Sequence, residues 1–219
     1  VSSVAVTTAE RIEDENIQSL YDVITRTPNV TDTYGPTGFT IRGISERGTG
    51  GGNGGLATVY VDGAPLPSDG IYAGPLNMWD VQQVEILRGP QSTLFGKNAS
   101  AGVVSIVTKR PTDAFEGTVE ASIAEGGEYR GRATVNLPMG ESVRSRFTGF
   151  YSTYDGNIRN QTTGKDVNGY KHYGIRGVVE ADLGEAVTLT LRGDWRKADD
   201  DCCAEIIGIV TGEGQSEVV

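Results

Sequence analysis

Apolar and polar residues alternate with a period of two through most of the chain after residue 115. In residues 187–196, Val, Leu and Trp alternate with Thr, Arg and Asp, broken only by Gly193. This pattern is typical of a β-strand with one apolar and one polar face. Four similar stretches precede it, so the pattern predicts about five strands of roughly nine to eleven residues. These strands begin near Phe115, Tyr129, Val143, Tyr173 and Val187.

The connections between these strands alternate in length. Residues 137–140 and 183–186 are expected to be tight turns, whereas residues 155–171 form a long polar loop and a longer loop follows Lys197. Short turns at one end and long loops at the other are typical of outer-membrane β-barrels. Aromatic residues near the strand ends suit the girdles at the membrane interfaces. These are Phe115, Tyr129, Tyr151, Tyr173 and Trp195.

A soluble antiparallel sandwich also shows alternation and is the alternative fold. Two features favour the membrane barrel. The polar faces carry charges along every strand, as a water-filled lumen would, and the strands exceed the usual five or six residues. Five strands are too few to close around a domain, since barrels with a plugged lumen have about 22 strands.

Before Pro111 the chain mixes apolar runs, turns and one helix irregularly. Ile17, Leu20, Tyr21 and Ile24 follow helical spacing, which predicts a helix with Asn16 as its N-cap and an end before Pro28. Strands are expected at residues 1–8, 56–61, 81–87 and 103–108, with a turn at Asp62-Gly63. The sequence therefore predicts an α+β domain over residues 1–112 and antiparallel barrel strands over residues 113–219.

Composition and charge exclude several classes of function. The 31 glycines favour turns and strands, and the net charge of −10 argues against nucleic acid as a partner. The sequence contains no run of about 18 apolar residues, so it predicts no membrane-spanning helix. A barrel strand needs only about ten residues, so a membrane barrel stays possible. No arrangement of a catalytic triad, a metal site or paired carboxylates stands out, so no enzyme activity and no cofactor are expected. The one histidine, His172, is expected to be solvated at the surface or in the lumen.

Two further local motifs give weaker indications of structure. Cys202 and Cys203 are adjacent and match no zinc motif, which predicts a disulfide with each other or with partners outside the chain. A metal site with residues 199–201 is the alternative. The glycines of residues 50–55 fit G-x-G-x-x-G, but a strand follows them where a nucleotide-binding fold needs a helix. This glycine-rich segment is therefore interpreted as a loop.

An ordered series of short motifs carries a resemblance to a known family. The motifs are 41–43 (IRG), 59–63 (VYVDG), 84–90 (VEILRGP), 94–96 (LFG) and 99–108 (ASAGVVSIVT). With this series the chain resembles the TonB-dependent receptors of Gram-negative outer membranes over its whole length, most strongly from Ile41 to Pro111. Phe95 stands where the family more often has Tyr, and Ala101 and Ser105 replace a Gly and an Asn.

The resemblance implies an α+β plug inside a 22-stranded barrel in the outer membrane. It implies that an extracellular ligand binds at the plug apex and that TonB, with ExbB and ExbD, pulls on a box near the plug N-terminus. A ferric siderophore is the expected ligand, with oligosaccharide, cobalamin or another nutrient as alternatives. A soluble α+β binding module with a β-sandwich is the alternative from another class. The TonB box is not recognisable in residues 1–8 and is expected upstream.

The resemblance also assigns residue roles. Arg42 and Arg88 each precede a glycine at a strand end, and the family's equivalent arginines latch the plug to glutamates on the barrel wall. Guanidinium groups pair bidentately with carboxylates, in agreement with that role. The loops at the plug apex supply candidate ligand contacts, namely Tyr34, Arg47, Asn53 and Tyr72.

Overall fold

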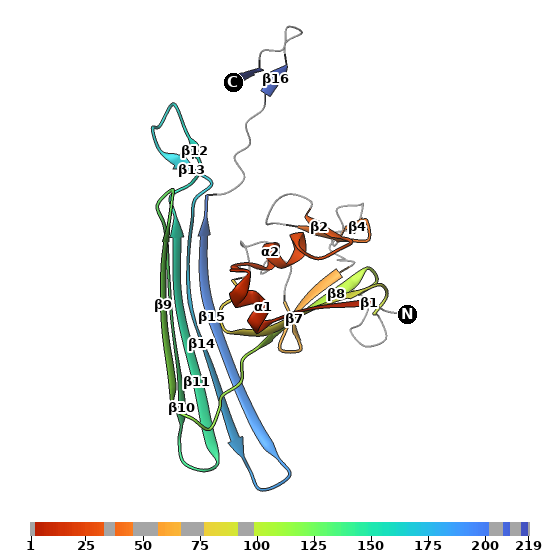
Figure 1. Ribbon diagram of the computed structural model, residues 1–219, viewed down its shortest axis with the longest axis vertical. Coiled ribbons are helices and arrows are strands. Elements are labelled where there is room, and N and C mark those ends of the chain that lie inside the picture. Colours follow the sequence, from red (N-terminus) through yellow and green to blue (C-terminus); the bar gives the residue numbers. More distant parts are fainter. Residues whose placement is uncertain are drawn as a thin grey trace.

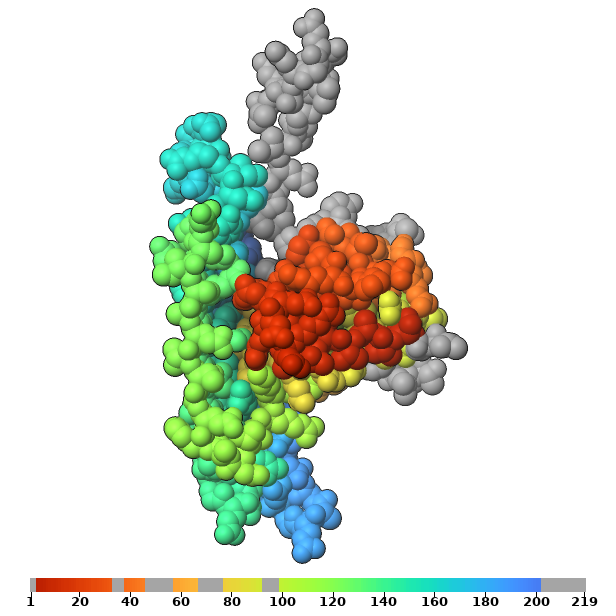
Figure 2. Space-filling view, viewed as in Figure 1, coloured from red at the N-terminus to blue at the C-terminus, as the bar shows by residue number. Residues whose placement is uncertain are grey.

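A computed structural model of the chain contains an α+β unit and a long curved sheet that lies beside it (Figure 1). The structure describes residues 3–32, 38–45, 57–66, 77–91, 99–201, 208–210 and 216–218. We call the α+β unit the plug and the long sheet the wall. The space-filling view shows the plug against one face of the wall (Figure 2). We call that face inner and the opposite face outer.

The plug is built on a five-stranded sheet of order β1-β7-β8-β5-β6. Only β5 and β8 run parallel, and the other neighbours are antiparallel. A second sheet of three short strands lies toward the end of the wall that carries β12 (Ile158–Arg159) and β13 (Asp166–Val167) (Figure 1). The strands are β1 (Ser3–Thr8), β2 (Val30–Asp32), β3 (Phe39–Ile41), β4 (Ile44–Ser45), β5 (Ala57–Val61), β6 (Ala64–Pro65), β7 (Val81–Arg88) and β8 (Gly102–Thr108).

Two short helices replace the single predicted helix, so the predicted helix start was wrong. They are α1 (Ala9–Asp14) and α2 (Leu20–Thr25). Asn16 has a positive φ of 49° and lies in the connection between them. Ser19 is the N-cap of α2, because its hydroxyl accepts from the backbone N–H of Asp22 and the Asp22 carboxylate accepts from the Ser19 N–H. This reciprocal capping box satisfies amide groups that a helix start leaves unpaired.

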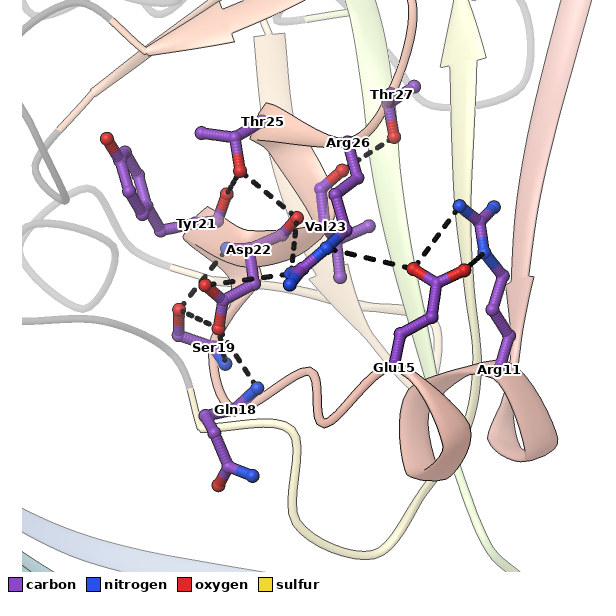
Figure 3. Close-up of polar contacts among 10 residues, drawn as sticks. All are labelled: Arg11, Glu15, Gln18, Ser19, Tyr21, Asp22, Val23, Thr25, Arg26 and Thr27. Atoms are coloured by element: carbon purple, nitrogen blue, oxygen red, sulfur yellow. Dashed lines mark hydrogen bonds and ion pairs between the residues drawn. The ribbon is translucent and has the colours of Figure 1, made fainter. Parts of the chain in front are cut away.

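Charged side chains link the two helices (Figure 3). Glu15 accepts from Nε of Arg11 at 2.6 Å and lies 3.7 Å from Nε of Arg26, which also approaches Asp22 at 3.8 Å. The hydrogen bond from Arg11 lowers the pKa of Glu15, and the same bond raises the pKa of Arg11. The pairs are solvent-exposed, so they orient the helices more than they stabilise the fold.

The plug core lies between the helices and the sheet. Val59, Val84 and Val104 are fully buried in the sheet, and Val23 of α2 packs in the same cluster. Gly102 opens β8, where an added Cβ would lie 2.4 Å from the carbonyl oxygen of Leu87. The β7–β8 pair therefore closes only with glycine at this position.

The wall is a five-stranded antiparallel sheet of order β15-β14-β11-β10-β9, which has the five strands that the alternation predicts. The loop between β11 and β14 forms a small hairpin, and two further short strands after β15 pair with each other in antiparallel fashion. No helix among the described residues is long and apolar enough to cross a membrane. The strands are β9 (Glu116–Ala124), β10 (Glu128–Pro138), β11 (Val143–Tyr154), β12 (Ile158–Arg159), β13 (Asp166–Val167), β14 (Tyr170–Asp182), β15 (Thr188–Asp200), β16 (Gly208–Val210) and β17 (Ser216–Val218).

The two faces of the wall differ as the alternation predicts. Even-numbered residues of β10, β11, β14 and β15 face the plug and include many charged side chains, whereas the odd-numbered residues are mostly apolar. Phe147, Ile175 and Trp195 of the outer face are exposed. The predicted aromatic positions Tyr129 and Tyr151 are also exposed on this face.

Candidate functional site

A turn of the plug docks on the inner face of the wall. Asp80 ends this turn with a positive φ of 55° and precedes β7. Its carboxylate accepts from Arg146 of β11, with Nη2 at 2.6 Å and Nε at 3.0 Å, and from Oγ1 of Thr148 at 2.9 Å. The Asp80 carbonyl accepts from the Lys109 N–H at 3.0 Å, which ties the turn to the end of β8. A charge-assisted, two-pronged pair of this kind fixes orientation as well as distance.

Trp79, the preceding residue, completes this contact. Its ring lies 4.4 Å from the Phe150 ring, and the guanidinium of Arg176 lies 4.4 Å over the same indole. Arg176 also donates to Asp194 at 2.9 Å, which carries the contact to β15. A cation over an indole is attracted to its π-face, and burial strengthens that attraction. We call Trp79 and Asp80 with their wall partners the seam.

The turn at Asp62-Gly63 forms a second contact with the wall. Asp62 and Gly63 have positive φ values of 50° and 83°, as the predicted hairpin turn requires. The Asp62 carboxylate accepts from the N–H and hydroxyl of Thr108 at 2.9 and 2.7 Å. The same carboxylate lies 3.4 Å from Arg192 of β15. Asp62 therefore links the plug sheet to the last described wall strand.

The link between the plug and the wall is fixed by one asparagine. Asn136 of β10 has 0% exposure and faces the connecting segment. Its side-chain oxygen accepts from the Thr112 N–H at 2.9 Å, and its amide donates to the Thr112 carbonyl at 2.8 Å and to the Ala114 carbonyl. The amide of Asn136 is the buried polar group here, and the backbone of Thr112 and Ala114, which lies outside both sheets, supplies its partners.

A polar and aromatic cluster lies on the inner face at the end of the wall that carries the β12–β13 hairpin (Figure 1). Tyr170 donates to Glu128 at 2.6 Å and accepts from Arg130 at 3.2 Å. The His172 ring stacks on Tyr170 at 4.8 Å, and its Nε2 lies 2.5 Å from Asp200. We call these five residues the rim cluster. His172 is only 3% exposed, so the expectation of a solvated histidine was wrong, because the ring stack and the carboxylate replace water.

The two predicted latch arginines follow β3 and end β7, and their side chains contact plug atoms near the start of β1. Arg42 donates to the hydroxyl of Ser3 at 3.0 Å, and Arg88 donates to the Pro28 carbonyl at 2.8 Å and toward the Ser3 carbonyl at 3.5 Å. Both side chains converge on Ser3, at the end of the plug sheet far from the described wall strands (Figure 1). Their predicted glutamate partners on the wall are not among the described residues that they contact.

The other predicted site residues lie outside the described residues. These are the apex candidates Tyr34, Arg47, Asn53 and Tyr72 and the two cysteines Cys202 and Cys203. Sequence reasoning missed the seam and Asn136. The available signals were a Trp-Asp pair directly before a predicted strand and the charges on the polar faces of the predicted wall strands.

Comparisons with known proteins agree with the sequence motifs. Residues 1–103 match the family model of the TonB-dependent receptor plug domain. The pesticin receptor of Yersinia pestis is 37% identical over 111 residues, which make up 50% of this chain and 16% of that receptor. The ferrioxamine receptor of Yersinia enterocolitica is 25% identical over 197 residues, which make up 89% of this chain and 26% of that receptor.

A solved structure matches both the plug and the wall. The ferric yersiniabactin uptake receptor of Yersinia pestis is similar with a TM-score of 0.72 and 26% identity, over 82% of this chain and 28% of that receptor. The chain thus spans between 16% and 26% of the length of the two curated relatives above.

Proposed function

Because the chain belongs to the TonB-dependent receptor family, we propose that it is the gate and first wall segment of an outer-membrane transporter that imports a ferric siderophore. In this proposal residues 1–112 are the plug and residues 113–219 begin a barrel of 22 strands. Transport is powered by TonB with ExbB and ExbD and involves no enzyme chemistry. The protein lies in the outer membrane of a Gram-negative bacterium, with lipid around its outer face.

The seam is the observation that carries this proposal. A soluble two-sheet protein buries apolar faces against each other. Here the plug meets the wall through Asp80, Arg146 and a cation over Trp79, whereas the apolar face of the wall points away from the plug. A charged inner face and an apolar outer face are the arrangement expected of a membrane barrel with a filled lumen.

The open edges of the wall support a longer barrel. Strands β9 and β15 each pair on one side only within the described sheet. Unpaired backbone groups are costly in lipid, so a membrane wall has to close. The relatives are about four to six times longer than the matched segment, which leaves room for the remaining strands.

The substrate class rests on the relatives and on the rim cluster. The ferrioxamine and ferric yersiniabactin receptors are named for iron complexes. In our proposal the apex residues Tyr34, Arg47, Asn53 and Tyr72 and the rim cluster face the entering ligand. Binding drives transport only if the ligand prefers the plug arrangement that recruits TonB.

The test uses the full-length protein in a strain that lacks its own siderophore receptors. Under iron limitation, growth is expected on at least one added ferric siderophore and is expected to stop when TonB is deleted. Tyr170→Ala is expected to weaken siderophore binding, whereas Thr118→Ala on β9 serves as the control. Growth restored only by an oligosaccharide or cobalamin would redirect the substrate class. A product whose SDS-gel mobility is unchanged by boiling would favour the soluble alternative.

We also propose the latch role for Arg42 and Arg88. In the full-length barrel each guanidinium has donors left for a wall carboxylate while it keeps its contact near Ser3. Replacing both with Ala is expected to raise the conductance of the protein in planar bilayers, with Arg26→Ala at the C-cap of α2 as the matched control. Unchanged conductance and unchanged plug release in the double variant would exclude the latch.

A further inference from the structure

The outer face of the wall carries a groove of about 840 Å³. Two pairs of small residues on neighbouring strands form its floor. Ala133 pairs with Gly149, and Gly177 pairs with Gly193 one level further along the strands. The floor therefore runs obliquely across β10, β11, β14 and β15.

Large apolar side chains flank this floor. Phe147, Ile175 and Trp195 line the groove, and these residues are 43%, 63% and 55% exposed, respectively. The Phe147 ring lies close to Gly177, where an added Cβ would meet ring atoms at 3.1 Å. The groove thus depends on glycine, and none of the described residues covers its flanking side chains.

Aromatic and cationic residues follow the groove in the direction of the β12–β13 hairpin. Tyr173 packs edge-on against Trp195 with 5.8 Å between ring centroids. Lys197 pairs with Tyr173 in the strand register and lies two residues beyond Trp195, a rise of about 7 Å. Lys171 follows Tyr173 at the next outer position, with Nζ 5.9 Å from the Tyr151 ring centroid.

The two lysines have no ionic partner in the part of the chain that the structure describes. Both side chains are exposed, and neither ammonium lies within ion-pair distance of a described carboxylate. Asp199 pairs with Lys171 in the strand register and is an acidic residue on the same face. Lys171, Lys197 and Asp199 together therefore carry a net positive charge.

We propose that this surface binds one phosphorylated lipid of the outer membrane. An acyl chain lies along Gly177 and Gly193 between Phe147 and Trp195, and the phosphate is held by Lys197 and Lys171. The occupant follows from charge complementarity, because an acyl chain matches the apolar floor and an anionic headgroup matches two unpaired ammonium groups beside aromatic rings. Aromatic residues lie at the headgroup level of a membrane, and basic residues there attract anionic lipid. The proposal rests on the barrel of the proposed function.

The experiment measures lipid bound to the full-length protein by native mass spectrometry. Delipidated protein is incubated with phosphatidylcholine vesicles that contain dipalmitoyl phosphatidic acid, with pure phosphatidylcholine vesicles, or with inorganic phosphate alone. One phosphatidic acid per chain is expected from the mixed vesicles, and no adduct is expected from free phosphate.

Variants test the headgroup contact and the groove separately. Lys171→Ala and Lys197→Ala are each expected to weaken binding by about fivefold, consistent with the contribution of a basic residue near a lipid surface. Lys165→Ala in the β12–β13 hairpin is the matched control. Gly193→Leu fills the floor without a clash, because an added Cβ meets no atom within 4 Å, and it is expected to remove the adduct. Leu189→Ala, on the same face outside the groove, is expected to retain it.

Several outcomes would overturn the proposal. These are an adduct that survives both lysine changes together, a groove variant that binds lipid normally, or a second copy of the chain in place of lipid. SDS-gel mobility with and without boiling is measured on the same samples. A wild-type protein without heat-dependent mobility overturns the barrel and the lipid site together. A heat-modifiable protein that retains no phosphatidic acid overturns the lipid site alone.

Discussion

Asp80 of the plug and Arg146 of the wall form a two-pronged ion pair in which Nη2 lies 2.6 Å and Nε 3.0 Å from carboxylate oxygens. The pair joins residues 66 positions apart in the sequence, one in the turn before β7 of the plug and the other in β11 of the wall. Both side chains are largely buried, with 4% of the Asp80 and 11% of the Arg146 side chain exposed. A pair in this position holds the start of β7 on the wall.

Removing Arg146 is expected to loosen the plug from the wall. Arg146→Ala leaves the Asp80 carboxylate buried with only Thr148 as a wall partner, and breaking a buried pair in this way costs about 3–5 kcal/mol. Hydrogen exchange of residues 79–84 in the full-length protein is expected to accelerate. Arg132→Ala is the control, because Arg132 lies on the same face and pairs with the exposed Glu120. Equal exchange in both variants would contradict a role of the seam in holding the plug.

Asn136 is expected to control access to the segment between plug and wall. Asn136→Leu keeps the branching of the side chain but removes its hydrogen bonds with Thr112 and Ala114. Each such bond contributes about 0.5–1.5 kcal/mol, so their loss together is expected to cost about 1–3 kcal/mol. If opening is fast relative to cleavage, limited trypsin digestion after Lys109 is expected to accelerate by about 5- to 150-fold. Thr118→Val, on exposed β9, is expected to leave the cleavage rate at the wild-type level. A rate that does not change in the Asn136 variant would show that Asn136 does not hold this segment.

A side chain at position 102 is expected to destabilise the plug. Gly102→Ala places a Cβ 2.4 Å from the Leu87 carbonyl oxygen and 2.8 Å from Cδ1 of Ile41, so β8 has to shift away from β7. Overpacking of this kind costs about 1–3 kcal/mol. It is expected to lower the free energy of opening of the plug by that amount, as measured by hydrogen exchange. The matched control is Gly193→Ala, whose Cβ meets no atom within 4 Å. Equal stability of the two variants would mean that the β7–β8 pair adjusts without strain.

The capping box at α2 is expected to contribute measurably to the plug. Ser19→Ala removes the acceptor for the Asp22 N–H, and loss of an N-cap side chain costs about 1 kcal/mol. Exchange of the first amides of α2 is expected to accelerate about fivefold. Thr25→Ala, which removes a hydroxyl at the other end of the same helix, is expected to leave those amides unaffected. Acceleration of the same size in both variants would indicate general weakening of α2 and would not support a specific cap.

The sequence predicted the elements that depend on neighbouring residues. Alternation identified the five wall strands, because each residue of a strand faces the side opposite to the next. The Asp62-Gly63 turn followed from residues that accept a positive φ. The helix start was misplaced at Asn16, because Ser19 caps α2 through Asp22 and both residues suit that role equally well in the sequence.

The sequence alone determined the faces of the wall, the strands of the plug and, through its motifs, the family. Only the tertiary structure decided which charges meet across the seam. The alternation places Arg146 on the polar face of a strand and Asp80 directly before a strand. It does not determine how one sheet packs against another. That placement depends on the summed contacts of Trp79, Asp80 and Asp62 with three wall strands, which form together only when the plug is docked.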